Sequence, residues 1–135
     1  MEVLAKNFFV NLPVKDLNKT KEFFSKLGFK FNPEFTNELA ACMIISNNVF
    51  AMLLTEDHFK NFTKKSIADT DNSTEAIMAL QVDSKEKVNE MVNNALAFGG
   101  KPSKEPMDHG FMYGWSFQDL DGHLWELFFM DGNSQ

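Results

Sequence analysis

The chain has 135 residues and a mass of 15.4 kDa, which suits one domain and is too short for two independent cores. Hydrophobic residues make up 44% and charged residues 24%, which excludes a disordered tail or a membrane-embedded chain. The net charge is −6 and the 13 positive residues are all lysine, so neither a basic patch nor a guanidinium fork is available for phosphates and we expect no nucleic-acid partner.

The first half of the chain predicts the element order βαβββ. Residues 7–14 form an apolar run, and Asp16 then precedes apolar residues at helical spacing that stop at a glycine. This pattern predicts a strand followed by a helix that Asp16 caps. Three strand-like runs come next, the last two separated by an Asn-Asn pair that suits a tight hairpin turn, at residues 29–35, 39–46 and 49–55.

The second half repeats this order. Residues 76–82 predict a strand, and Asp83 or Ser84 can cap the helix that follows. That helix has an apolar stripe at spacings of three and four and stops at a pair of glycines. Three more strands are predicted, with an Asp-Gly turn before the last, at residues 101–106, 111–117 and 124–130.

An offset of 68 residues aligns the first predicted strand of each half and the two candidate caps, Asp16 and Ser84. The halves therefore resemble a duplicated module. We predict an α+β fold in which two βαβββ modules form a cupped mixed sheet. A half of this size buries too little apolar surface alone, so the modules, about residues 1–65 and 66–135, should make a single domain. A short helix is expected at residues 58–62, in the polar connection between them.

Cys42 is the only cysteine and lies in an apolar run, so no internal disulfide can form and a buried, unreactive thiol is expected. No segment approaches the roughly 20 apolar residues that cross a bilayer, and the first residues do not have the pattern of a secretion signal. We therefore expect a reducing, cytoplasmic setting and no membrane partner.

Glu126 is the candidate catalytic residue. It interrupts an apolar strand, where a buried carboxylate needs a partner, a metal or a proton. Such a group could act as a general acid or base, or as an oxygen ligand to a metal. The structural alternatives are a hydrogen bond to a backbone amide or a position at the wet rim of the sheet. We expect an apolar ligand pocket around Glu126 that includes Phe9, Asn11, Ile77, Tyr113 and Trp115.

The three histidines differ in what their positions predict. His123 lies three residues before Glu126, which on a strand places the two side chains on opposite faces, so they should not bind one ion. His58 follows a strand in a polar connection and should be solvated. His109 lies in a glycine-bracketed loop, residues 108–114, and is a candidate ligand-binding residue, with a plain turn as the alternative.

The doubled βαβββ order resembles the vicinal oxygen chelate superfamily of glyoxalases, bleomycin resistance proteins and extradiol dioxygenases. Two segments carry this resemblance, residues 14–17 (VKDL) and 119–127 (DLDGHLWEL). Three more segments are similar to a bacterial group described as predicted lactoylglutathione lyases: residues 9–14 (FVNLPV), 40–43 (AACM) and 108–114 (DHGFMYG).

The resemblance implies a dimer and a divalent metal held by four side chains from the first and last strands of the modules. The corresponding positions here carry Phe9, Met52 or Leu53, Ile77 and Glu126. A hard divalent cation needs several oxygen or imidazole donors, and one carboxylate among apolar side chains does not supply them. We therefore predict no metal cofactor, with a divalent metal bound through Glu126 as the alternative.

These observations predict a glyoxalase-like homodimer that acts on or binds a small organic molecule, which Glu126 polarises or deprotonates. Since the chain has no arginine to hold the carboxylates of glutathione, a true lactoylglutathione lyase is not expected. If the protein is an enzyme, the resemblance implies a lyase-like or isomerase-like activity. The alternatives are a metal-free dimer that sequesters an antibiotic-like molecule, and a dimeric interaction protein without a small ligand.

Overall fold

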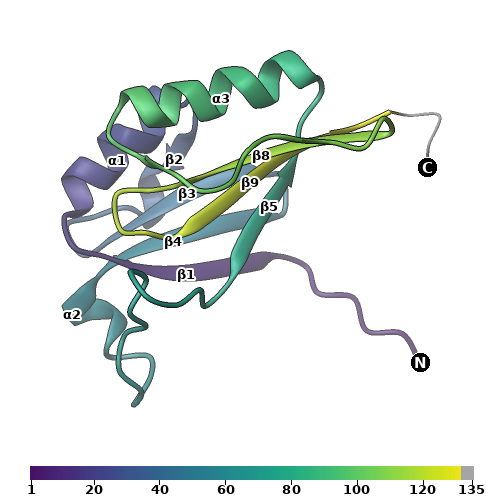
Figure 1. Cartoon of the computed structure of the whole chain (residues 1–135). Coiled ribbons are helices and arrows are strands. Elements are labelled where there is room, and N and C mark those ends of the chain that lie inside the picture. The colour runs from purple at the N-terminus through teal and green to yellow at the C-terminus, as the bar shows by residue number, and fades with distance from the viewer. Residues whose placement is uncertain (132–135) are drawn as a thin grey trace. The chain divides into compact units, whose positions relative to one another are not determined.

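The computed structural model describes residues 1–131. The chain divides into two compact units, Met1–Ile67 and Ala68–Gln135, and each contains one mixed β-sheet with a helix packed against it (Figure 1). The predicted α+β class and its two βαβββ modules are confirmed. That the two units act as a single domain stays a prediction.

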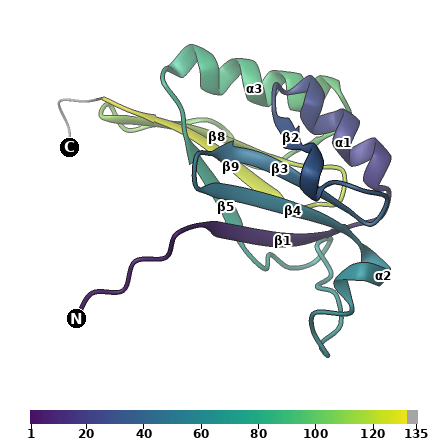
Figure 2. The same ribbon diagram turned by 180° about the vertical axis from the view of Figure 1, so that it is seen from behind.

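The first unit is a four-stranded sheet with α1 (Leu17–Lys26) against β3 and β4 (Figure 2). The edge strand β1 runs parallel to β4, and the other neighbouring strands are antiparallel. The strands lie in the order β1 (Phe8–Val14), β4 (Val49–Thr55), β3 (Ala40–Ser46) and β2 (Lys30–Asn32).

The second unit is a five-stranded sheet with α3 (Lys85–Ala97) against β8 and β9. The edge strand β5 runs parallel to β9, which repeats the arrangement of β1 and β4. The strands lie in the order β5 (Ile77–Gln81), β9 (Leu124–Met130) and β8 (Met112–Gln118), with β6 (Lys101–Pro102) and β7 (Met107–Asp108) both paired to β8.

The helix caps show the repeat at atomic detail. The side chain of Asp16 accepts a hydrogen bond of 3.1 Å from the amide of Lys19, and that of Ser84 accepts one of 3.0 Å from the amide of Lys87. Donor and acceptor are both displaced by the predicted 68 residues. Each cap satisfies a backbone N–H that a helix start otherwise leaves without a partner.

The strand predicted at residues 29–35 ends earlier than expected. The side chain of Asn32 accepts a hydrogen bond of 3.0 Å from the amide of Glu34 and caps a single 3₁₀ turn, η1 (Pro33–Phe35). Pro33 opens this turn because proline has no N–H to donate to a sheet. The strand therefore stops at its third residue.

Two other predicted elements also differ in the structure. The helix expected at residues 58–62 is α2 (Glu56–Phe59), which begins earlier because the side chain of Thr55 accepts a hydrogen bond of 3.3 Å from the amide of His58. The strand expected at residues 101–106 is broken into the two-residue strands β6 and β7, which pair with opposite ends of β8.

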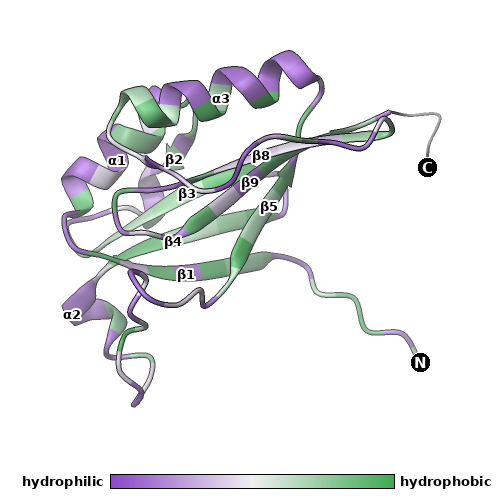
Figure 3. Ribbon diagram, viewed as in Figure 1, coloured by the Kyte–Doolittle hydropathy of each residue, from purple (hydrophilic) through white to green (hydrophobic). Residues whose placement is uncertain are grey.

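Each core lies between a helix and one face of its sheet. The strands are largely hydrophobic, whereas the helices alternate between hydrophobic and hydrophilic residues (Figure 3). Fully buried side chains include Val14, Phe24 and Leu53 in the first unit, and Val88, Val92 and Trp125 in the second. Within residues 1–131, no helix is both long and apolar enough to cross a membrane.

Candidate functional site

One face of the second unit's sheet carries Glu126. In the register of β9 with its neighbours, Glu126 lies opposite Ser116 of β8 and Ala79 of β5. Residues directly opposite in paired strands point to the same face, with Cβ atoms about 5 Å apart. Leu124 and Phe128 are the next residues of β9 on this face. Glu126 is therefore the one ionisable group in a row of small and apolar side chains, which we call the Glu126 face.

The Glu126 side chain is half-buried, although β9 lies inside the sheet rather than at its edge. Among residues 1–131, its carboxylate makes no hydrogen bond or ion pair. The structural alternative in which a backbone amide holds this carboxylate is therefore not observed. The two neighbours of Glu126 in register, Ala79 and Ser116, both have short side chains.

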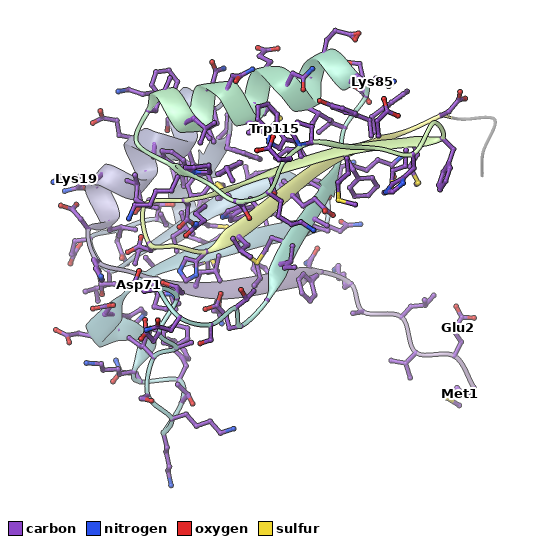
Figure 4. All side chains as sticks on the ribbon, in the orientation of Figure 1. Met1, Glu2, Lys19, Asp71, Lys85 and Trp115 are labelled. Atoms are coloured by element: carbon purple, nitrogen blue, oxygen red, sulfur yellow. The ribbon has the colours of Figure 1, made fainter. Side chains whose placement is uncertain are left out.

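Ile77 shares this face, because it pairs with Leu124, and its side chain is 60% exposed. Tyr113 and Trp115 do not. They lie on the opposite face, where Figure 4 shows Trp115 beneath α3. The hydroxyl of Tyr113 donates a hydrogen bond of 2.6 Å to Oδ1 of Asn89 on α3. Strand alternation gives the physical reason, since Ser116, not Trp115, stands in register with Glu126. This placement corrects the expectation that Tyr113 and Trp115 share a pocket with Glu126.

His109 lies in the tight turn between β7 and β8. Its amide donates a hydrogen bond of 2.8 Å to the carbonyl of Met112, and Gly110 adopts φ of +82°. Met112 lies four positions before Ser116 on β8, a distance of about 14 Å along a strand. The structure therefore does not bring His109 beside Glu126, and the alternative of a plain turn describes its surroundings.

This turn is also held by charge. The amide of Gly110 and the ammonium group of Lys85 both donate to the carboxylate of Asp108, at 2.9 and 3.3 Å. The amide contact and then the lysine contact lower the pKa of Asp108. Both side chains are about half exposed, so this ion pair contributes little to stability.

Phe9 and Asn11 belong to the first unit, on the face of its sheet opposite α1. The ring of Phe9 stacks on that of Phe50 with centroids 5.0 Å apart, and Asn11 stands in register with Met52. Leu53 points the other way and is fully buried. The register therefore selects Met52, rather than Leu53, as the residue on the same face as Phe9.

The donor set does not fit the divalent metal that the resemblance implies. In the first unit, Phe9 and Met52 offer no oxygen or nitrogen donor. In the second, Ile77 offers none and Glu126 is the single carboxylate. Among residues 1–131, no group of three or more His, Cys, Asp or Glu side chains is placed to hold a metal ion. That the protein works without a metal stays a prediction.

A buried polar network that the sequence patterns did not predict lies at the turn before β9. Asp119 is 2% exposed, and its Oδ1 accepts hydrogen bonds from the amides of Asp121 and His123 at 2.9 and 3.0 Å. Its Oδ2 accepts one of 2.9 Å from Nε1 of Trp125. Burial raises the pKa of the Asp119 carboxyl, and it outweighs the lowering effects of His123 and of these hydrogen bonds.

His123 is the other buried member of this network. It is 1% exposed, and its Nδ1 lies 3.4 Å from Oε1 of Glu75, whose side chain is 29% exposed. The ring is therefore enclosed rather than presented to a ligand. The signal in the sequence was the Asp-x-Asp-Gly-His pattern, in which an aspartate side chain can accept from amides two and four residues later.

The two βαβββ modules, each with a helix packed on one face of its sheet, have the architecture of a glyoxalase-like fold. The model of the Glyoxalase/Bleomycin resistance protein/Dioxygenase superfamily matches residues 8–127, and the chain belongs to this superfamily. A comparison with curated protein sequences gave no match.

Solved structures with this fold include a hypothetical protein from S. aureus, with 29% identity and a TM-score of 0.79 over 94% of this chain and 95% of that one. A glyoxalase/bleomycin resistance protein/dioxygenase family enzyme from Burkholderia phytofirmans PsJN has 16% identity and a TM-score of 0.75 over 91% of this chain and 97% of that one. The genomically encoded fosfomycin resistance protein of Listeria monocytogenes has 22% identity and a TM-score of 0.67 over 98% and 97%.

Proposed function

We propose that this protein binds a small organic molecule on the Glu126 face without a divalent metal. The observation that carries the proposal is the half-buried carboxylate of Glu126, which has no partner among residues 1–131 and stands between the short side chains of Ala79 and Ser116. A carboxylate in such a place binds a ligand group that donates hydrogen bonds, and the apolar residues around it bind the rest of the molecule.

Membership of the superfamily supports the proposal that the ligand is a small molecule. Its name includes bleomycin resistance proteins, and one structural relative is a fosfomycin resistance protein. The donor set supports a mode of binding without metal, because Glu126 alone cannot satisfy a hard divalent cation. The absence of arginine disfavours glutathione conjugates, whose two carboxylates are best held by guanidinium forks.

A second candidate is a lyase-like or isomerase-like enzyme in which Glu126 removes or returns a proton. The same observation favours it, because a general base must have a free oxygen within hydrogen-bond reach of the substrate. Binding and catalysis then differ in one respect. A binding protein releases its ligand unchanged, whereas an enzyme releases a product.

We also propose a homodimer. The edge strands β1 and β5 carry Phe8, Phe9 and Ile77, whose side chains are 60%, 49% and 60% exposed. Unpaired edge strands with apolar side chains are templates for association with another chain. Sedimentation equilibrium should therefore give twice the mass of the chain, and a monomer at micromolar concentration would refute the dimer.

A thermal-shift screen of small organic molecules tests the proposed function. The panel includes fosfomycin and glutathione, and each compound is run with and without the chelator EDTA. We expect a compound that raises the melting temperature equally in both conditions, and no effect of glutathione. Mass spectrometry of the recovered compound then separates binding, which leaves it intact, from turnover. Stabilisation that EDTA abolishes would refute binding without a metal.

A further inference from the structure

A polar pocket of about 280 Å³ lies within the second unit. Its wall is the loop of residues 70–74, together with Ser103, Gln118, Gly122 and Leu124. Gln118 and Leu124 are paired across β8 and β9, and each lies two residues along its strand from Ser116 or Glu126. The pocket therefore adjoins the Glu126 face but is built mainly from loop residues that this face does not include.

Two contacts between distant segments hold the loop in place. The hydroxyl of Thr70 donates a hydrogen bond of 2.6 Å to the carbonyl of Asp121, 51 residues away in the sequence. At the other end of the loop, Glu75 contacts the buried ring of His123 at 3.4 Å. The pocket thus lies between a tethered loop and the turn that precedes β9, rather than beside a free segment.

The hydrogen bonds of the lining side chains run in one direction. Thr70 donates to Asp121, the hydroxyl of Ser73 donates to the carbonyl of Asp69 at 3.1 Å, and Nδ2 of Asn72 donates to Oδ2 of Asp69 at 2.7 Å. In the same way, Nε2 of Gln118 donates to the carbonyl of Pro102 at 3.0 Å. The hydroxyls of Thr70 and Ser73 have thereby used their only donor, and the amides of Asn72 and Gln118 have used one of two, so the side-chain oxygen of each of the four offers an acceptor.

The charge of the lining, like its hydrogen-bond acceptors, favours a cation. Asp71 is its one ionisable residue, no lysine lines it, and the Asp71 carboxylate has no hydrogen bond or ion pair among residues 1–131. An anion would be repelled here. A bare metal ion would fill a small part of the volume, and no group of three His, Cys, Asp or Glu side chains in the described part of the chain could hold it.

We propose that this pocket binds a small organic cation through its ammonium group. An ammonium ion has three donors and no acceptor, which matches a lining of hydroxyl, amide and carboxylate oxygens. Asp71 supplies the opposite charge, and Thr70, Ser73 and the amide side chains supply the remaining acceptors. The inference does not rest on the proposed function, because the pocket could bind such a cation whether or not the Glu126 face binds a ligand.

The test is an NMR titration of the full chain in about 0.15 M NaCl, a concentration that screens diffuse attraction to the acidic surface. The probes are 1,4-diaminobutane and 1,4-butanediol, which have the same carbon chain and differ in their charged amines. We expect saturable amide shifts at residues 70–74 and Gln118 with the diamine only. Equal shifts with the diol, or no saturation of the diamine shifts below about 50 mM, would overturn the proposal.

Variants locate the charge that binds the cation. Asp71→Asn should weaken diamine binding about fivefold, the effect of losing one exposed ion pair of about 1 kcal/mol. Asp83→Asn is the matched control, because Asp83 is also an exposed aspartate of the second unit and does not line the pocket. Equal losses in the two variants would show general attraction to negative charge and would overturn a specific site at Asp71. The comparison of the two probes on the wild-type protein needs neither variant.

Discussion

Ser116 lies directly opposite Glu126 across the antiparallel pair of β8 and β9, and both side chains point away from α3. The residue before Ser116 is Trp115, which points toward the helix side (Figure 4). The carboxylate is therefore bordered by a small hydroxyl side chain rather than by an indole. The immediate surroundings of Glu126 are consequently more open and more polar than its apolar strand suggests.

Replacing Glu126 tests its role. Glu126→Gln keeps the shape of the side chain and removes its charge. We expect an unchanged fold, a loss of any turnover, and ligand affinity weakened by about tenfold or less, the range expected for one charge-assisted hydrogen bond. Calorimetry on the ligand from the screen and a product assay measure the two effects. Glu90→Gln, at an exposed position of α3, is the control. Unchanged affinity and turnover in Glu126→Gln would contradict the proposed role.

Tyr113 should matter for stability and not for binding. Tyr113→Phe removes the hydroxyl that bonds to Asn89, and we expect a loss of about 1 kcal/mol in the free energy of unfolding. The Glu126 face lies on the other side of the sheet, so ligand affinity should not change. Urea denaturation and calorimetry on the same preparation give both values. If Tyr113→Phe had normal stability but bound the ligand more weakly, Tyr113 would belong to the ligand site.

Gly110 and Gly122 form a matched pair. Both adopt positive φ, +82° and +81°, so replacement by alanine imposes the same backbone strain at each, about 1–2 kcal/mol. A Cβ at Gly110 would meet nothing within 4 Å, whereas one at Gly122 would lie 2.6 Å from Oγ1 of Thr70. We therefore expect Gly122→Ala to lower the free energy of unfolding by about 1–3 kcal/mol more than Gly110→Ala does.

The contact with Thr70 can be isolated by a double-mutant cycle. Adding Thr70→Gly to Gly122→Ala removes the side chain that the new methyl group would strike, so the combined loss should be smaller than the sum of the single losses. The free energies come from urea denaturation. Strict additivity, or equal losses for Gly110→Ala and Gly122→Ala, would mean that the loop does not pack on the turn as described.

Asp119 should make stability depend on pH. Its ordinary pKa is 3.8 and burial raises the value in the folded protein, so the unfolded chain loses this proton first as the pH rises. The contribution of Asp119 is therefore greatest below about pH 4 and declines as the pH rises through the raised pKa. The Asp119→Asn variant does not titrate at this position, and the difference in stability between wild type and variant should shrink as the pH rises.

The same variant should be less stable than wild type by about 1–3 kcal/mol at low pH, because an amide nitrogen cannot accept from Nε1 of Trp125. Urea denaturation at a series of pH values rising from the ordinary pKa of 3.8 measures the difference. Asp83→Asn controls for the change in net charge. A difference that grows with pH would show that the ionised form of Asp119 is the stabilised one.

Local patterns predicted the elements of the fold well. Asp16 and Ser84 were candidate caps because a cap depends on residues within three positions, and both accept the expected hydrogen bonds. The Asn47–Asn48 turn likewise connects β3 and β4 as predicted. The predicted end of the strand at residues 29–35 was wrong, because the side chain of Asn32 accepts a hydrogen bond from the amide of Glu34 and ends β2.

Contacts between distant residues could not be predicted in the same way. The side-chain alternation of β8 defines two faces, but only its register with β9 decides that Ser116, rather than Trp115, is beside Glu126. The contact of His123 with Glu75 joins residues 48 positions apart, and the polar pocket depends on a similar contact of Thr70. Such pairs follow from the packing of loops on strands, which the pattern of one sequence does not contain.

A side chain that fills the space beside Glu126 should block the binding of a small molecule there. Ala79→Phe places a ring next to the carboxylate at an exposed position, while Asn93→Phe adds the same ring to the exposed side of α3. Calorimetric titration with the screened ligand should show affinity lowered at least about tenfold in Ala79→Phe and unchanged in Asn93→Phe. Undiminished binding by a folded Ala79→Phe variant would show that the ligand does not bind beside Glu126.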